Sequence, residues 1–163
     1  MANTLAEKYG DRIEKHFSKY PDKRSAVMPL LYIAQEEYGY VSPEGINEVA
    51  ELCEMDPTQV KSIAGFYTMY SEKPKGKYWL QVCTDLPCAL RGADDFYAWL
   101  KEHLGVEEHG TTDDGLFTVE HVMCLAACDR APMLQCNFHY QENLDQEKMK
   151  DLIEKWRAEA NGS

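Results

Sequence analysis

The chain has 163 residues, a formal net charge of −11 at pH 7 and 44% hydrophobic residues. This length suits one ordinary domain or two small ones that bury an apolar core. The acidic charge argues against nucleic acid and anionic membranes as partners, because phosphate binding needs clustered Lys and Arg. No apolar run has the length of a membrane-spanning helix, so we expect no direct membrane insertion.

The first residues, Met1 to Gly10, contain no basic patch followed by an apolar stretch, which argues against a secretory signal. Glu7, Asp11 and Glu14 argue against an unprocessed transit peptide. We therefore expect a reducing, cytoplasmic compartment. In that setting, paired cysteines are metal or redox sites more often than disulfides.

Residues 1–72 are predicted to form a four-helix bundle domain, because their apolar residues recur at helical spacing. Ser25 is expected to cap the second helix, and Pro43 and Pro57 to open the third and fourth. The bundle contains no catalytic constellation. Its expected apolar faces are Leu5, Tyr9, Ile13, Phe17 and Tyr20; Leu30, Leu31, Ile33 and Ala34; Ile46, Val49, Ala50 and Cys53; and Val60, Ile63, Ala64 and Tyr67.

Two features of this part have competing interpretations. Cys53 lies on an apolar face, which favours a buried free thiol over a metal ligand. The aromatic run 66–70 is read either as core or as an exposed docking surface, and the sequence leaves both open. The polar stretch 71–77, with Pro and Gly, is predicted to be the linker to a second domain spanning 73–163.

The second domain is predicted to have the element order β-α-β-β-β-α, or one close to it. Tyr78 to Cys83 and Leu116 to Met123 alternate as strands, and Met133 to Cys136 pairs with His139 to Gln141 in a hairpin. A helix follows Cys88, and another begins at about Asp145. We expect Cys88 itself at the start of its helix, where free N–H groups stabilise an anionic group. The fold class is thus α+β or α/β: a helical bundle followed by a small α/β sandwich.

Four cysteines in two close pairs define the candidate site. Cys83 and Cys88 form a C-x4-C pair, and Cys124 and Cys128 form a C-x3-C pair. Both pairs follow predicted strands, so their loops can bring four thiolates to one soft-metal centre. The first gap of four residues is shared with plant-type ferredoxins, whereas zinc knuckles usually have gaps of two. The spacing therefore favours a [2Fe-2S] cluster, with structural zinc as the alternative.

Other redox, metal and cofactor sites fit the pattern of Cys, His and Gly residues less well. A thioredoxin-type redox pair needs C-x-x-C, which is absent, and a Rieske centre needs two paired His ligands. His16, His103, His109, His121 and His139 are therefore read as surface or strand residues, and Cys136 as a buried thiol. Isolated glycines give no phosphate-binding loop, so NADH and flavin are not expected to bind this chain. Acidic residues near the cysteines predict a low-potential centre.

Three longer motifs resemble the E subunits of bacterial NADH-quinone oxidoreductase, the thioredoxin-like [2Fe-2S] ferredoxins that partner the flavin subunit of respiratory complex I. They are Val82-Cys83-Thr84-x-x-Pro87-Cys88-x-Leu90-Arg91-Gly92-Ala93, Cys124-Leu125-x-Ala127-Cys128-x-x-Ala131-Pro132-Met133-x-Gln135 and Tyr140-x-Glu142-Asn143-Leu144. Tyr20-Pro21-x-Lys23-Arg24-Ser25-Ala26 and Gly39-Tyr40-Val41 extend the resemblance to the N-terminal part.

The resemblance implies a thioredoxin-like domain whose one [2Fe-2S] cluster is bound by Cys83, Cys88, Cys124 and Cys128. It implies an electron-transfer subunit without catalytic residues, in the cytoplasmic peripheral arm of a membrane-associated complex. The cluster would exchange single electrons with the FMN of a partner that binds flavin and NADH. Equivalent subunits occur in NAD-linked hydrogenases and formate dehydrogenases, and a zinc-stabilised four-cysteine binding module is the alternative of another class.

The sequence departs from the family pattern at two positions beside the second cysteine pair. Met123 stands where the family usually has Glu, and Ala126 where it has Gly. Loss of a carboxylate is expected to raise the potential of the centre. Loss of the glycine is expected to shift the loop if backbone must approach the cluster closely.

Overall fold

The computed structural model describes residues 4–162, and the ends of the two predicted domains, residues 1–3 and 163, lie outside this range. The chain divides into two compact units, with the division after Pro74. The first unit contains the helices α1 (Thr4–Phe17), η1 (Lys23–Ala26), α2 (Val27–Tyr38), α3 (Pro43–Leu52) and α4 (Pro57–Phe66).

Local sequence signals set most helix ends in this unit. Ser42 and Asp56 cap α3 and α4 by accepting hydrogen bonds from Gly45 and Thr58, each followed by proline in the first turn. Such a cap stabilises a helix by about 1 kcal/mol. The expected cap at Ser25 is wrong: Asp22 caps a short 3₁₀ helix that contains Ser25, and α2 begins only at Val27. The carboxylate of Asp22, rather than the hydroxyl of Ser25, therefore caps this turn.

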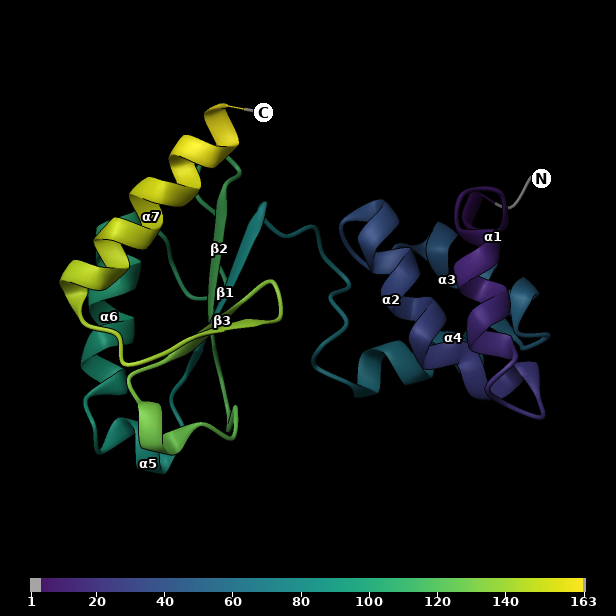
Figure 1. The fold of residues 1–163 in the computed structure, drawn as a ribbon, viewed down its shortest axis with the longest axis horizontal. Helices are drawn as coiled ribbons and strands as arrows, with labels where there is room; N and C mark the ends of the chain where they lie inside the picture. The colour runs from purple at the N-terminus through teal and green to yellow at the C-terminus, as the bar shows by residue number, and fades with distance from the viewer. Residues whose placement is uncertain (1–3, 163) are drawn as a thin grey trace. The chain divides into compact units, whose positions relative to one another are not determined.

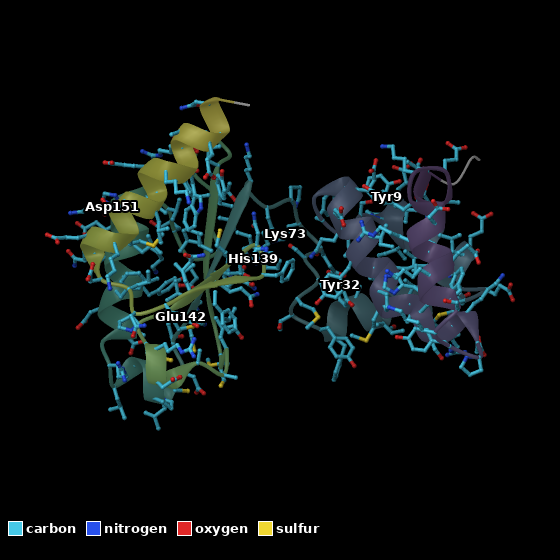
Figure 2. The ribbon with its side chains drawn as sticks, in the orientation of Figure 1. Tyr9, Tyr32, Lys73, His139, Glu142 and Asp151 are labelled. Carbon is cyan, nitrogen blue, oxygen red and sulfur yellow. The ribbon has the colours of Figure 1, made fainter. Side chains whose placement is uncertain are left out.

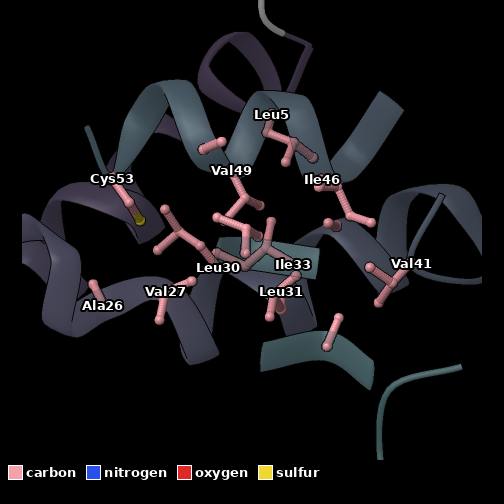
Figure 3. Packing of buried hydrophobic residues seen from close by; sticks show 14 of the residues in the cluster. Leu5, Ala26, Val27, Leu30, Leu31, Ile33, Val41, Ile46, Val49 and Cys53 are labelled. Atoms are coloured by element: carbon pink, nitrogen blue, oxygen red, sulfur yellow. The ribbon is translucent and has the colours of Figure 1, made fainter. Parts of the chain in front are cut away.

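Helices α1 to α4 pack around one apolar core (Figure 3). Leu5, Leu30, Leu31 and Val49 are fully buried in it. Cys53 belongs to this core and is 1% exposed. Burial raises the pKa of its thiol to about 11, so Cys53 stays protonated at neutral pH. The prediction of a buried free thiol is confirmed.

The aromatic run 66–70 is partly core and partly exposed surface, so each of the two sequence interpretations holds for part of it. Tyr70 is buried, and its hydroxyl donates to the backbone oxygen of Met28 at 3.0 Å. Phe66 is 78% exposed, so one end of the run is core and the other lies on the surface.

The second unit consists of a four-stranded mixed sheet with the strand order β2-β1-β3-β4 (Figure 1). Strands β1 and β2 are parallel, and the β1–β3 and β3–β4 pairs are antiparallel. Helices α6 and α7 lie on the same side of the sheet (Figure 1). The elements are β1 (Tyr78–Cys83), α5 (Leu86–Ala89), α6 (Ala93–Leu104), β2 (Phe117–Val122), η2 (Cys128–Arg130), β3 (Leu134–Cys136), β4 (His139–Gln141) and α7 (Gln146–Asn161).

The predicted element order is confirmed, and the arrangement fits the predicted thioredoxin-like fold class. Asn137 and Phe138 both have positive φ at the β3–β4 turn, which is the backbone that a tight hairpin needs. Asp145 caps α7 by accepting from the backbone N–H of Lys148. No helix among residues 4–162 combines the length and apolarity needed to cross a bilayer.

Candidate metal centre

The parallel pairing of β1 and β2 brings the two cysteine loops to the same edge of the sheet. Cys83 is the last residue of β1 and pairs with Val122, the last residue of β2. Since the carboxyl ends of parallel strands coincide, the loop after each strand starts at this edge. Cys88 follows Cys83 in one loop, and Cys124 follows Val122 in the other.

Backbone hydrogen bonds hold the two loops together. The N–H of Thr84 donates to Val122 O at 3.1 Å, and the N–H of Cys83 donates to Met133 O at 3.3 Å. Arg91 also links the loops, because its Nε donates to Ala131 O at 3.0 Å. These contacts fix the ends of the second loop beside the first.

Three of the four predicted ligands come together. The thiols of Cys83 and Cys128 lie close enough to the thiol of Cys88 to raise its pKa. Burial raises the pKa of Cys88, and the neighbouring thiols raise it further. A metal centre here must therefore displace protons when thiolates replace thiols. Cys83 and Cys88 are each 1% exposed, in a small apolar cluster with Ala93 and Met133.

Cys124 is the most exposed of the four predicted ligands. It is exposed, and its Sγ accepts a hydrogen bond from the backbone N–H of Ala126 at 3.4 Å. Its loop is anchored at Leu125, whose backbone oxygen accepts from the hydroxyl of Tyr140 at 2.6 Å.

The expectation for Cys88 and a helix N-terminus is wrong. Cys88 lies inside the four-residue helix α5, and its N–H already donates to Asp85 O at 2.8 Å. The longer helix α6 begins only at Ala93, after Gly92 in a left-handed conformation. The periodic apolar residues predicted one continuous helix, whereas the chain has a break between α5 and α6. Gly92 permits this break because glycine adopts positive φ readily.

Ala126 also has positive φ, at +58°. This conformation costs an L-residue roughly 1–2 kcal/mol, and glycine avoids that cost. Backbone conformation thus gives a reason for the glycine that the resemblance implies here, whereas the sequence pattern alone pointed to close approach of the backbone to the cluster. Met123, the other departure, is 67% exposed beside Cys124.

Cys136, His121 and His139 lie on strands of the second unit, and His109 lies in the loop after α6. Cys136 is buried in β3, and burial raises its pKa to about 12, so it remains an inert thiol. His139 is exposed on β4. His109 and His121, read from the sequence as separate surface or strand residues, lie together with Glu108. The sequence carries no signal for this group, because a loop and a strand supply its members and no motif spacing joins them.

The chemistry of the donor set fits an iron–sulfur centre better than one zinc ion. Four sulfurs around one zinc ion lie about 3.8 Å from each other, given Zn–S bonds of about 2.3 Å. Within the described part of the chain, no three cysteine sulfurs lie within 4.8 Å of one another. Two irons with separate sulfur pairs require no such tight set.

A profile of the thioredoxin-like [2Fe-2S] ferredoxin family matches residues 13–157. The E subunit of the Rickettsia bellii NADH-quinone oxidoreductase is 43% identical over 147 residues, which cover 88% of each chain. Subunit 2 of the Thermus thermophilus NADH-quinone oxidoreductase is 42% identical over 151 residues, 91% of this chain and 83% of that one. The Mycobacterium bovis E subunit is 40% identical over 141 residues, 86% of this chain, and the match spans only 56% of that relative.

A crystal structure of an NAD⁺-reducing [NiFe]-hydrogenase has the same fold, with a TM-score of 0.69 and 20% identity. The match covers 80% of this chain and 23% of that one. The family profile spans most of the chain, including both cysteine pairs. The chain therefore belongs to the thioredoxin-like [2Fe-2S] ferredoxin family and carries one [2Fe-2S] cluster.

Proposed function

We propose that this chain is an electron-transfer subunit of an NADH-quinone oxidoreductase, with Cys83, Cys88, Cys124 and Cys128 as its cluster ligands. One observation carries the proposal: the thiols of Cys83, Cys88 and Cys128 meet beside the loop of Cys124 in a chain of this family. When bound, the cluster supplies a centre that accepts and releases one electron at a time.

The chain's own residues hold the centre and set its access to solvent. Cys83 and Cys88 form the buried side, where apolar neighbours exclude water. Cys124 and Cys128 form the open side, because Cys124 is exposed and Cys128 half-buried. We assign electron exchange to this open side, since electron transfer requires close approach of a partner.

Exposed apolar side chains near the cysteines support a protein partner at this end of the domain. Leu86 is 69% exposed, Leu90 81% and Met123 67%. Each lies within two residues of a proposed ligand. Exposed apolar side chains clustered around a site are typical of an interaction surface. The partner that best fits the named relatives is a subunit that binds FMN and NADH, with both cofactors on that subunit.

The names of the relatives support a place in an NADH-quinone oxidoreductase complex, whose cytoplasmic peripheral arm we propose as the location. We also propose residues 1–72 as a separate four-helix bundle domain and 73–163 as the cluster domain. In this proposal the bundle has no redox role and adds contact area to the complex.

A second candidate is the equivalent subunit of an NAD-linked hydrogenase or formate dehydrogenase. The observation in its favour is the fold shared with the NAD⁺-reducing hydrogenase. Higher identity to the quinone-linked relatives, at 40–43%, favours the first candidate. The zinc-stabilised four-cysteine module has no comparable support, given the separation of the sulfurs.

The proposal is tested by anaerobic purification from the native host with a tag on this chain. We expect two irons and two labile sulfides per chain, and an EPR signal after dithionite reduction. A flavin-containing subunit should co-purify with membrane subunits that react with quinone. Co-purification with a nickel-containing hydrogenase subunit would favour the second candidate, and zinc without iron or sulfide would refute both.

A further inference from the structure

A compact group of potential metal ligands lies outside the cysteine loops. It consists of the carboxylate of Glu108 and the imidazoles of His109 and His121, with one ligand atom of each within 4.8 Å of the others. Among residues 4–162, no other set of three His, Cys, Asp or Glu side chains is grouped this closely. We call these three residues the His–Glu site.

Backbone contacts fix the elements that carry the His–Glu site. Glu108 and His109 lie in the loop after α6, and His121 lies on β2. The loop folds back on the strand: Val119 N–H donates to Gly110 O at 3.0 Å, and Thr112 N–H donates to Phe117 O at 2.8 Å. The juxtaposition is therefore part of the fold of the domain.

The carboxylate of Glu108 is oriented by its neighbours. The hydroxyl of Tyr97 donates to its Oε1 at 2.9 Å, and Lys101 Nζ lies 3.3 Å from its Oε2. Both imidazoles face the same Oε1: His121 Nδ1 lies at 2.5 Å and His109 Nε2 at 3.7 Å. Both ring nitrogens thus lie close to one carboxylate oxygen.

A buried carboxylate stands behind one of the imidazoles. His109 Nδ1 lies 3.4 Å from Glu120 Oε2, which leaves Nε2 directed at Glu108. Glu120 is 7% exposed and is held by Lys75 Nζ at 2.9 Å and Gln81 Nε2 at 3.1 Å. Metal-binding histidines usually donate their second N–H to such a carboxylate, which fixes the tautomer and the ring.

We propose that Glu108, His109 Nε2 and His121 Nδ1 bind a divalent transition-metal ion of the zinc class, with water at the remaining position. Imidazole nitrogen and carboxylate oxygen suit Zn²⁺ and related ions, and three protein ligands with an open position are a common zinc arrangement. On binding, the ion takes the place of the proton between His121 Nδ1 and Glu108, and neutral His121 keeps its single ring proton on Nε2. Tetrahedral ligands lie about 3.3 Å apart, so this pair opens by roughly 0.8 Å.

The test is a calorimetric titration of Zn²⁺ into the full chain with its oxidised cluster in place, so that the cluster thiolates are occupied. We expect one ion per chain and unchanged visible absorbance. His109→Ala and His121→Ala should each weaken binding about tenfold or more, and Glu120→Gln about tenfold to a hundredfold. His139→Ala is the matched control, because His139 is exposed on β4 of the same unit (Figure 2) and should have no effect.

Lys101→Met provides a variant with the opposite expected effect. Lys101 places a positive charge beside the Glu108 carboxylate, so its removal should strengthen Zn²⁺ binding. A purely structural ion-pair network predicts no such gain. The proposal is overturned if the parent chain binds no Zn²⁺, if both histidine variants bind as the parent does, or if binding bleaches the visible absorbance, which places the ion at the thiolates.

Discussion

Cys83 and Val122 are paired at the ends of two parallel strands, and this register determines where the two cysteine loops meet. Cys124 closely follows Val122 in the chain, so a shift of one strand by one residue would move one thiol pair along the sheet by about 3.3 Å. The site depends on a long-range pairing between segments that are far apart in the sequence.

Cys83→Ser and Cys124→Ser should bleach or perturb the visible spectrum of the anaerobically prepared chain, because each removes a proposed thiolate ligand. Cys53→Ser and Cys136→Ser are the controls, since both thiols are buried in apolar cores and stay protonated. Their spectra should match the parent. Equal loss of absorbance in Cys136→Ser would refute the four-ligand assignment.

Ala126→Gly should stabilise the cluster domain. It relieves a left-handed conformation that costs roughly 1–2 kcal/mol, offset by about 0.4–1 kcal/mol of added entropy in the unfolded chain. We expect a net gain of about 0.5–1 kcal/mol in the unfolding free energy. Urea unfolding followed by tryptophan fluorescence measures it, since Trp79, Trp99 and Trp156 all lie in this unit.

Ala158→Gly is the matched control for this measurement. Ala158 is exposed within α7, where glycine should cost about 1 kcal/mol. Destabilisation by both variants to the same degree would show that the backbone of Ala126 is unstrained.

Met123→Glu should lower the midpoint potential of the cluster, because a carboxylate beside Cys124 disfavours an added negative charge. The measurement is an EPR-monitored redox titration. Met123→Gln changes shape and polarity without charge, so its potential should lie near that of the parent. An unchanged potential in Met123→Glu would contradict the electrostatic argument.

Lys75→Met should destabilise the cluster domain in a pH-dependent way. Burial alone would raise the pKa of Glu120, but Lys75, with Gln81 and His109, outweighs burial and lowers it. The stabilisation is therefore present above the unfolded-state pKa of about 4.3 and is lost as pH falls through the lower folded value. Removing Lys75 should cost about 3 kcal/mol at pH 7, and this cost should shrink as pH falls, because the isolated buried carboxyl then protonates.

Lys155→Met is the control for Lys75→Met, because the Lys155–Glu159 pair is exposed on α7. Exposed pairs contribute less than about 1 kcal/mol, so this variant should change the unfolding free energy little at any pH. Similar losses in both variants, or a loss in Lys75→Met that is independent of pH, would argue against the buried-pair explanation.

The sequence by itself determined most of the helices and strands and the chemistry of the ligands. Hydrophobic periodicity and capping residues such as Ser42 and Asp145 act over a few residues, so they are readable without a fold. The two cysteine pairs and the number of residues between their members likewise indicated a sulfur-ligated metal centre. For Cys53 and Cys136, an apolar face or a strand predicts burial, and both are buried.

Only the tertiary structure decided what depends on backbone conformation or on contacts between distant segments. It showed the break between α5 and α6 that removes Cys88 from a helix N-terminus, and the positive φ of Ala126. It also brought His109 and His121 together around Glu108. These features depend on turns and on contacts between distant segments. Periodic patterns in the sequence describe single helices and strands, so they do not predict such contacts.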